Sequence, residues 1–200
     1  MLAHEVPALP CGEDWLYEFL WGGERIRALK RPGRVRLIGK DGRDLSNRFP
    51  RVAAAVARLR PAAALLDGEV LLLDRYGGEA VRRLAPAAAD MAQARVAFLA
   101  FDLLEHNGSD LRAQSLLCRR LKLAAILQGT PILLSPRIYA TPGPALAEAA
   151  RLGLAGVVAK RGGAAYRPNS VTIEWVKVSA ASRRADVADE ELAARHPLVA

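Results

Sequence analysis

The sequence predicts an α+β fold of largely antiparallel sheets flanked by helices. Two observations support this prediction. Strand-like apolar segments and segments of helical periodicity are mixed along the 200 residues without a β-α-β rhythm. An early pair of strand-like segments is joined by a tight turn, as in an antiparallel hairpin. The length predicts one domain, and a hydrophobic fraction of 52% is enough to build its core.

The first part of the chain is expected to be mostly extended. Residues 15–39 have strand character, and the Pro-Gly pair at 32–33 places a hairpin turn within them. A helix is expected over 49–59, because its apolar residues recur every three or four positions: Phe49, Val52, Val56 and Leu59.

The rest of the chain mixes strands and helices. Residues 65–74 predict a strand that Asp-Gly-Glu interrupts at 67–69, followed by a turn at 76–78. The nearly unbroken apolar run at 96–104 predicts a buried central strand. Two amphipathic helices are expected after it, over 113–127 and 143–152, together with three strands: 132–139, 156–160 and 171–178.

Composition excludes several classes of protein. No apolar run approaches the ~20 residues of a membrane-spanning helix, so no membrane partner is expected. The first residues lack the pattern of a secretory signal. Two distant cysteines and three histidines exclude a disulfide framework and a Cys/His zinc site. This cysteine usage suits a cytoplasmic protein.

Positive charge is concentrated early in the chain. The net charge is +8, yet residues 24–60 alone carry twelve Lys/Arg against three acidic residues, a balance of +9. Arginine dominates this set, and its planar fork suits phosphate oxygens. The charge favours a nucleotide or nucleic-acid partner, although a solvated basic face would give the same pattern.

Five groups of residues carry chemically informative patterns. In chain order they are Trp-Leu-Tyr-Glu-Phe-Leu-Trp-Gly-Gly-Glu-Arg at 15–25, the basic segment 36–45 with Arg-Phe-Pro at 48–50, Leu-Asp-Gly-Glu-Val at 66–70 with Ala-Phe-Asp at 100–102, Leu-Ala-Gly-Val-Val-Ala-Lys at 154–160 with Tyr-Arg-Pro at 166–168, and Trp-Val-Lys-Val-Ser at 175–179. This ordered set resembles the adenylation domain of ATP-dependent DNA ligases, especially bacterial repair ligases of the polymerase-fused type. The resemblance implies a ligase-type nucleotidyltransferase domain of ATP-grasp-like architecture, with ATP and Mg as cofactors. It also implies DNA with nicked or broken ends as partner, and a role in DNA repair and recombination.

Four positions depart from the family pattern. In the family, a lysine of the first motif attacks the α-phosphate of ATP and forms a lysyl-AMP intermediate, which requires a primary amine. Leu20 occupies that position and cannot form a phosphoramidate. Three further substitutions replace an aspartate, a glutamate that resembles a metal ligand, and a lysine near the α-phosphate: Gly22, Ala155 and Ser179. The resemblance therefore implies a degenerate domain, a pseudoenzyme that does not self-adenylate, with no intact catalytic residue and no metal ligand.

Other family positions are retained. The resemblance places Arg25 and Glu69 at the ribose, Phe101 against the adenine, and Lys160 and Lys177 near the phosphates. Alternatives remain: Phe101 as a core aromatic, Glu69 as a solvated residue beside a turn, and Lys160 as the exposed end of a strand. Trp21 and Trp175 are interpreted as packing residues.

The basic segment resembles the DNA-contacting part of the family. It supplies the candidate nucleic-acid contacts: Arg34, Arg36, Lys40 and Arg43. Lys40 is a poor replacement for the missing nucleophile. Five strand residues separate it from the level of Leu20 and displace its amine by on the order of 15 Å, whereas in-line attack tolerates about 1 Å.

The domain organisation is expected to be a ligase-like adenylation domain over 1–179 and a short tail over 180–200. After residue 178 only 22 residues remain, too few for the OB-fold that follows in family ligases. Two alternative functions stay open. One is an active DNA ligase or nucleotidyltransferase that uses a displaced lysine or a partner chain, and the other is a non-enzymatic basic module that binds DNA, RNA or a partner protein.

Overall fold

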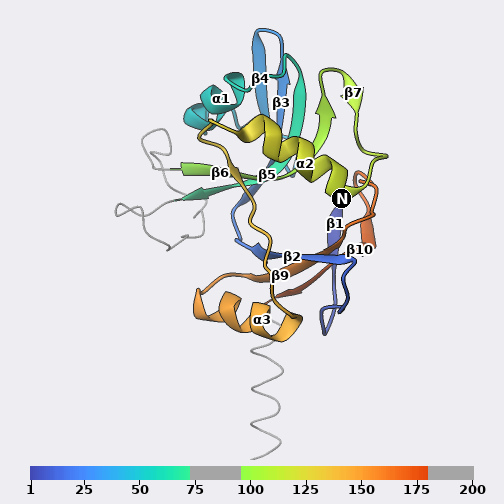
Figure 1. Ribbon diagram of the computed structural model, residues 1–200. Coiled ribbons are helices and arrows are strands. Elements are labelled where there is room, and N and C mark those ends of the chain that lie inside the picture. The colour runs from blue at the N-terminus through green and yellow to red at the C-terminus, as the bar shows by residue number, and fades with distance from the viewer. Residues whose placement is uncertain (73–95, 180–200) are drawn as a thin grey trace, which may run out of the picture.

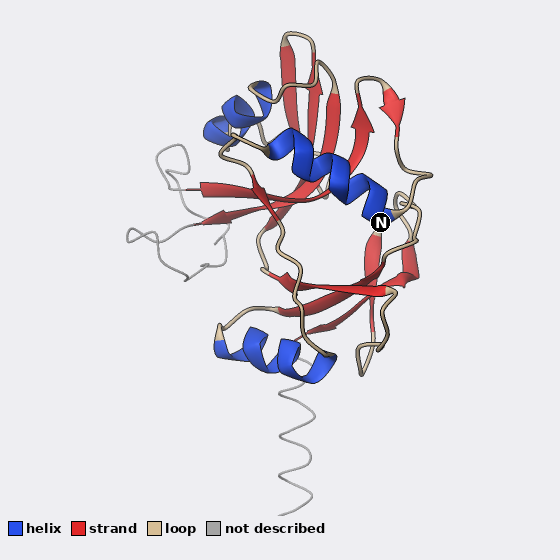
Figure 2. Cartoon of the chain, viewed as in Figure 1, coloured by secondary structure: helices blue, strands red, loops and turns tan. Residues whose placement is uncertain are grey.

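Two β-sheets face each other, with helices on their outer sides (Figure 1, Figure 2). The computed structural model describes residues 1–72 and 96–179. The expected turn at 76–78 and the expected tail over 180–200 lie outside the described residues. No helix in the described ranges is long and apolar enough to cross a membrane.

The four-stranded sheet combines the start and the end of the described chain. Its order is β1 (Leu2–Glu5), β10 (Val171–Ser179), β9 (Gly156–Arg161) and β2 (Trp15–Leu20). β9 pairs antiparallel with both neighbours, whereas β1 lies parallel to β10.

The six-stranded sheet holds the middle of the chain. Its path is β4 (Arg34–Gly39), β3 (Glu24–Arg31), β5 (Ala64–Leu72), β6 (Val96–His106) and β7 (Ser109–Asp110), and β8 (Leu133–Leu134) pairs parallel with β6. The other pairings are antiparallel, which confirms the predicted fold class.

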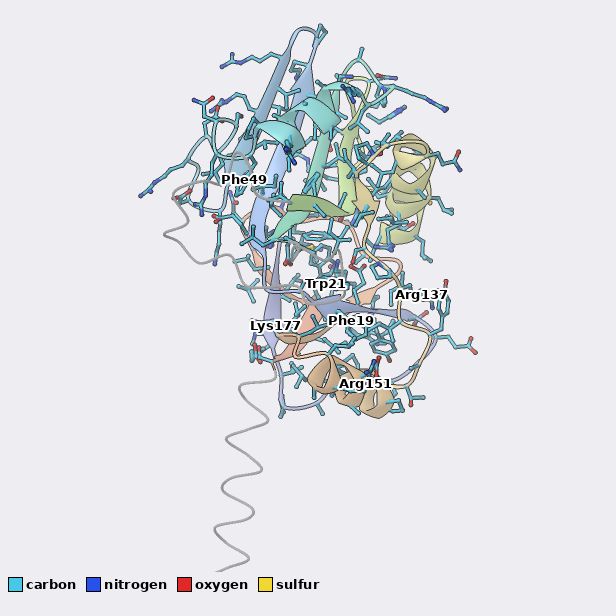
Figure 3. All side chains as sticks on the ribbon, turned by 90° about the vertical axis from the view of Figure 1, so that its left-hand side faces the viewer. Phe19, Trp21, Phe49, Arg137, Arg151 and Lys177 are labelled. Carbon is cyan, nitrogen blue, oxygen red and sulfur yellow. The ribbon has the colours of Figure 1, made fainter. Side chains whose placement is uncertain are left out.

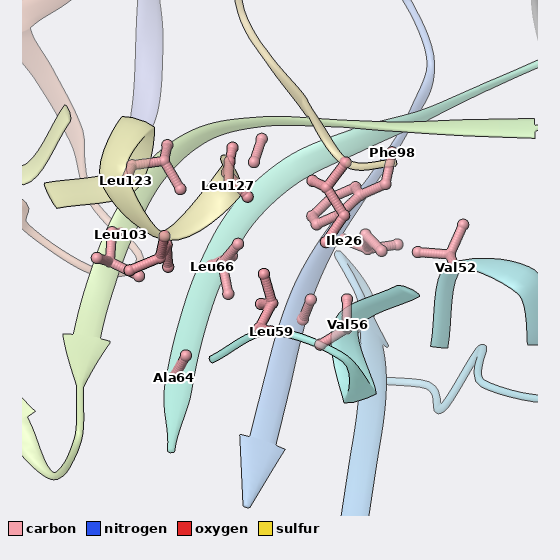
Figure 4. Close-up of a cluster of buried hydrophobic side chains, with 14 of the residues drawn as sticks. Ile26, Val52, Val56, Leu59, Ala64, Leu66, Phe98, Leu103, Leu123 and Leu127 are labelled. Atoms are coloured by element: carbon pink, nitrogen blue, oxygen red, sulfur yellow. The ribbon is translucent and has the colours of Figure 1, made fainter. Parts of the chain in front are cut away.

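Helices α1 (Pro50–Ala57) and α2 (Leu116–Leu127) cover the outer face of the six-stranded sheet. Figure 4 shows side chains of α1 and α2 meeting those of β3, β5 and β6 in one core. Ser115 caps α2 by accepting a hydrogen bond from the backbone N–H of Cys118. Helix α3 (Pro142–Arg151) covers the outer face of the four-stranded sheet through small residues, Ala145 and Ala149.

A third apolar cluster lies where the two sheets face each other. It joins β6, α2 and β10 through Phe101, Leu116 and Trp175, together with Met1 and Tyr166. The inner faces of the two sheets are therefore in contact, and they bring motif residues from distant parts of the sequence together.

Three details differ from the sequence predictions. β5 continues through Asp-Gly-Glu, and the predicted interruption is reduced to a shift in its register with β6 between Asp67 and Gly68. Gly68 lets β6 approach where a Cβ would meet Phe98 and the carbonyl oxygen of Leu99. The strand expected over 132–139 is reduced to β8, since Pro136 lacks the N–H that would continue the ladder. β1 was not predicted, because four residues carry too little periodicity.

Candidate nucleotide site between the two sheets

Strand alternation divides the residues of β2 between two environments. Tyr17, Phe19 and Trp21 pack towards α3, so Leu16, Glu18 and Leu20 face the six-stranded sheet. Figure 3 shows Phe19 and Trp21 beside each other above the helix that carries Arg151. The inner face of β2 therefore carries a buried carboxylate, Glu18, two residues from Leu20, which the resemblance placed at the nucleophile position.

The positions that the resemblance marked as departures lie at one end of the four-stranded sheet. Leu20 pairs with Gly156, and Gly156 also pairs with Ser179. The backbone N–H of Ala155 donates a hydrogen bond to the carbonyl oxygen of Leu20 at 2.9 Å. Gly22 follows directly, with a φ of 74° that favours glycine. Positions up to 159 residues apart thus form one patch. The carboxylate of Glu5 on β1 borders it and accepts hydrogen bonds from the backbone N–H and the hydroxyl of Ser179 at 2.9 and 3.0 Å.

A buried ionic network lies two residues before Leu20. Glu18 is only 1% exposed. Its carboxylate accepts hydrogen bonds from Arg120 Nη1 at 2.6 Å, Ser135 Oγ at 2.7 Å and Lys160 Nζ at 2.9 Å. One carboxylate therefore compensates two cations and links β2 to β9, α2 and the segment after β8.

Lys160 is held between aromatic rings at the centre of the site. Its Nζ lies 4.3 Å from the ring centroid of Phe101 and 4.4 Å from that of Trp175. Burial lowers the pKa of Lys160, against the opposing effect of Glu18. With 3% exposure, its interpretation as the exposed end of a strand is wrong. The resemblance assigned the ring of Phe101 to adenine stacking. In the structure Lys160 lies over this ring, and Phe101 belongs to the inter-sheet cluster.

A second buried ionic group lies across the site on the six-stranded sheet. Arg25 on β3 donates two hydrogen bonds to Asp67 on β5, at 3.1 and 2.6 Å. The hydroxyl of Tyr166 donates to the same carboxylate at 2.8 Å. Arg25 thus belongs to an intramolecular ion pair with a fully buried partner, while its guanidinium lies 5.5 Å from the ring centroid of Phe101.

Glu69 lies within β5, opposite Arg25, and not beside a turn. Its carboxylate accepts a hydrogen bond from the backbone N–H of Gly23 at 2.9 Å. Burial raises the pKa of Glu69, although this hydrogen bond and the charge of Lys160 favour the ionised form. A partly desolvated carboxylate of this kind is a candidate hydrogen-bond acceptor for a ligand hydroxyl.

Lys177 lies at the edge of the site. It shares the inner face of β10 with Trp175, as the alternation predicted, and its ammonium contacts Glu5 on β1 at 3.0 Å. The indole nitrogen of Trp175 is buried and has no hydrogen-bond partner among the described residues. Trp175 therefore offers a donor to a polar ligand in the site.

Two of the predicted nucleic-acid contacts, Arg34 and Arg36, lie on β4, and the other two, Lys40 and Arg43, follow directly after this strand. Arg36 pairs with Asp44 at 2.9 Å, and Arg43 pairs with Asp41 at 3.0 Å. Arg34 and Lys40 have no ion-pair partner within residues 1–72 and 96–179. Only two of the four predicted cations are thus uncompensated in the described structure.

The donor set at the changed end of the site does not suit Mg. A hard divalent cation prefers several carboxylate oxygens, whereas Leu20, Gly22 and Ala155 offer none. The carboxylate of Glu5 at this end is already held by Lys177 and Ser179. Among the described residues no group of three or more His, Cys, Asp or Glu side chains could hold a metal ion. No reaction step through a metal is therefore derived for this chain.

Sequence reasoning missed most of the buried polar groups. Four such residues contribute to the site: Glu18, Arg120, Ser135 and Asp67. Glu18 and Asp67 lie within the motifs but were given no role, and Arg120 and Ser135 lie outside them. For Glu18 there was a signal, because a charged residue alternates with Leu16 and Leu20 on the inner face of a strand. Arg120 and Ser135 gave none, since they are 102 and 117 residues away from Glu18.

Comparison with known proteins relates the whole described fold to one family. The model of the ATP dependent DNA ligase domain matches residues 1–179. The multifunctional non-homologous end joining protein LigD of Pseudomonas aeruginosa is 36% identical over 186 residues, which is 92% of this chain and 22% of that protein. LigD of Mycobacterium tuberculosis is 31% identical over 164 residues, 82% of this chain and 21% of that protein. The chain thus spans about a fifth of these relatives.

Solved structures agree with this relationship. A mycobacterial DNA ligase D complexed with ATP and MES is 28% identical and superposes with a TM-score of 0.71, covering 90% of this chain and 60% of that one. The ligase domain of Mycobacterium tuberculosis LigD, also 28% identical, gives a TM-score of 0.66 over 88% of this chain and 58% of that one. The two-sheet architecture is therefore that of DNA ligase nucleotidyltransferase domains.

Proposed function

We propose, from the premise that this chain belongs to the ATP-dependent DNA ligase domain family, that it is a domain of repair-ligase type which binds nucleotide and nucleic acid without forming a covalent adenylate. One observation carries the proposal: Leu20, Ala155 and Ser179 lie together at the end of the four-stranded sheet. The nucleophile and its surroundings are changed as a group, while the residues assigned to the nucleoside remain assembled on the opposite strands.

None of the lysines near the site replaces the nucleophile in this proposal. Lys160 is opposite Leu16, four residues from Leu20, which corresponds to about 13 Å along the strand. Its ammonium is also held by Glu18. Lys177 is two residues before Ser179 and two strands away from β2, and Glu5 neutralises it. In-line attack tolerates only about 1 Å of displacement.

The retained groups support binding of the nucleoside part of a nucleotide. The carboxylate of Glu69 and the unpartnered indole N–H of Trp175 are the polar groups in the site with capacity for a ligand. When bound, ATP would supply an activated phosphate, but this chain places no amine at Leu20 to receive it. Lys160 lies 4.3 Å from the ring centroid of Phe101, so stacking of an adenine on that face of the ring would require Lys160 to move.

Intact-mass measurement tests the covalent part of the proposal. The protein is incubated with ATP and Mg, denatured and weighed, beside the Pseudomonas aeruginosa LigD ligase domain as a positive control. We expect no mass increase in this chain. An increase of one AMP would overturn the proposal in favour of a displaced lysine, and Lys160→Arg and Lys177→Arg would then identify which amine reacted.

Thermal shifts with adenosine, AMP and ATP test the binding part. We expect saturable stabilisation that Glu69→Gln weakens, because the substitution removes the charged acceptor but keeps the shape. Glu148→Gln is the matched control, since this exposed carboxylate lies on α3, outside the site. Absence of any shift with all three compounds would contradict nucleotide binding.

A further inference from the structure

A cavity of about 250 Å³ lies beside the inter-sheet site, between the β3–β4 hairpin and the segment after β9. Its apolar wall includes Ile38, Leu65 and Leu104. Arg27 and Lys40 line it as well, and none of the lining residues is acidic in the described parts of the chain. The cavity therefore combines an apolar wall with positive charge.

The cations of this cavity differ in how far they are compensated. Arg25 is paired with the buried Asp67, and Arg112 makes an ion pair with Asp110 at 2.7 Å. Arg27 and Lys40 have neither an ion pair nor a side-chain hydrogen bond to any described residue. The backbone of half-buried Arg27 is fixed between β4 and β5, opposite Ile38 and Asp67, while its guanidinium makes no ion pair with a described residue.

The pairing register extends this positive charge along the hairpin. Arg27 pairs with Ile38, Leu29 with Arg36, and Arg31 with Arg34, and directly paired residues share one face of an antiparallel ladder. Two cations of this face are compensated, because Arg31 makes an ion pair with Glu105 and Arg36 with Asp44. Arg27 and Arg34 therefore carry its unpaired charge among the described residues. The opposite face packs on α1 through Ile26, Ala28 and Leu37. From Arg34 to Lys40, the exposed face spans about 20 Å and leads into the cavity.

We propose that this cavity receives one unstacked nucleotide of a single-stranded nucleic acid, whose backbone follows the hairpin. Arg27 and Lys40 contact the phosphate, and the base lies against Ile38, Leu65 and Leu104. The inference rests on the nucleic-acid binding proposed above and names the form of nucleic acid that the hairpin prefers.

Volume and chemistry favour a single strand over a duplex. The cavity is slightly smaller than the ~300–1,000 Å³ of drug-sized ligand sites, so it admits one base but no paired bases. In a duplex the bases are stacked and paired, and turning one outward costs a few kcal/mol. Unpaired bases are already free to splay from the backbone. A ridge of cations alone would bind both forms, whereas a pocket with an apolar wall distinguishes them.

Fluorescence anisotropy with three labelled probes tests the proposal: octathymidylate, an octamer of abasic sites, and an eight-base-pair duplex. We expect octathymidylate to bind most tightly. Arg27→Gln should weaken its binding about tenfold, as expected for one charge-assisted hydrogen bond, and reduce the salt slope by about 0.7. Lys40→Gln provides a second variant at an exposed position, in case Arg27→Gln perturbs the fold.

Arg51→Gln is the matched control, because it removes the same charge from exposed α1 on the other face of the sheet. It should change the affinity less than twofold. Three results would overturn the proposed nucleotide pocket. They are equal affinities for octathymidylate and the abasic octamer, a higher affinity for the duplex, and equal effects of Arg27→Gln and Arg51→Gln on the affinity. Failure of all three probes would instead refute nucleic-acid binding itself, and the AMP thermal shift would still decide nucleotide binding separately.

Discussion

The buried carboxylate of Glu18 should contribute more to stability than any cation that it contacts. Glu18→Gln keeps the shape of the side chain but leaves Lys160 and Arg120 without their shared counter-charge. Removing one partner from a buried ion pair costs about 3–5 kcal/mol in the free energy of unfolding. At about 2–4 °C per kcal/mol for a chain of this size, the melting temperature should fall by roughly 6–20 °C.

Lys160→Met provides the comparison. In this variant, Glu18 still accepts hydrogen bonds from Arg120 at 2.6 Å and Ser135 at 2.7 Å, so no buried charge is left alone. The cost should be about 1.5–3 kcal/mol, that of a hydrogen bond to a charged group. The double variant should be destabilised by less than the sum, because Glu18→Gln no longer leaves two cations uncompensated.

Urea denaturation of the four proteins measures these differences. Glu148→Gln serves as a control, because it breaks an exposed ion pair with Arg151 and should hardly move the urea midpoint. The reasoning is refuted if Glu18→Gln costs less than about 1 kcal/mol, or if the effects of Glu18→Gln and Lys160→Met simply add.

Two further predictions concern buried polar and backbone positions. Burial raises the pKa of Glu69 above its unfolded value of 4.5, so the contribution of this carboxyl to stability declines as pH rises through the folded pKa. Glu69→Gln should therefore raise the melting temperature at pH 7 and flatten the fall of the melting temperature above pH 4.5. A lower melting temperature of the variant at pH 7 would contradict this. Gly156→Ala should cost about 2–4 kcal/mol in urea denaturation, because φ is 142° and a Cβ would clash with the carbonyl oxygen of Val178. Gly143→Ala in α3, where a Cβ meets open space, should be neutral or stabilise by up to about 1 kcal/mol, and equal losses at both glycines would count against the steric argument.

Local sequence signals predicted the elements whose stabilising contacts are local or periodic. Pro-Gly at 32–33 marks the turn between β3 and β4, and the apolar spacing from Phe49 onward marks α1. The predicted start of α2 at 113 was three residues early, because the capping hydroxyl of Ser115 sets the first turn. These features depend on backbone preferences and burial of one face, which a short window of sequence contains.

The composition of the site depends instead on which distant residues meet. The motif order identified Arg25 and Lys160, but their partners are set by the pairing of the sheets. Lys160 reaches Glu18 across 142 residues, and Arg25 reaches Asp67 across 42. A sequence shows that a lysine follows an apolar run, but not whether its ammonium meets solvent, a carboxylate or an aromatic ring. The exposed-end interpretation of Lys160 failed for this reason.

The distribution of buried charge explains how such a domain could lose a nucleophile and keep its fold. A domain is stable by only about 5–15 kcal/mol, and breaking the buried pair of Asp102 with Arg119 would remove about 3–5 kcal/mol of this. Leu20 and Ser179 are in a different situation, because neither compensates a buried charge, and their backbones hold the strand ladder whatever the side chain. Substitution at Leu20 and Ser179 therefore has little effect on the free energy of unfolding, whereas substitution in a buried ion pair such as Asp102 with Arg119 lowers it strongly.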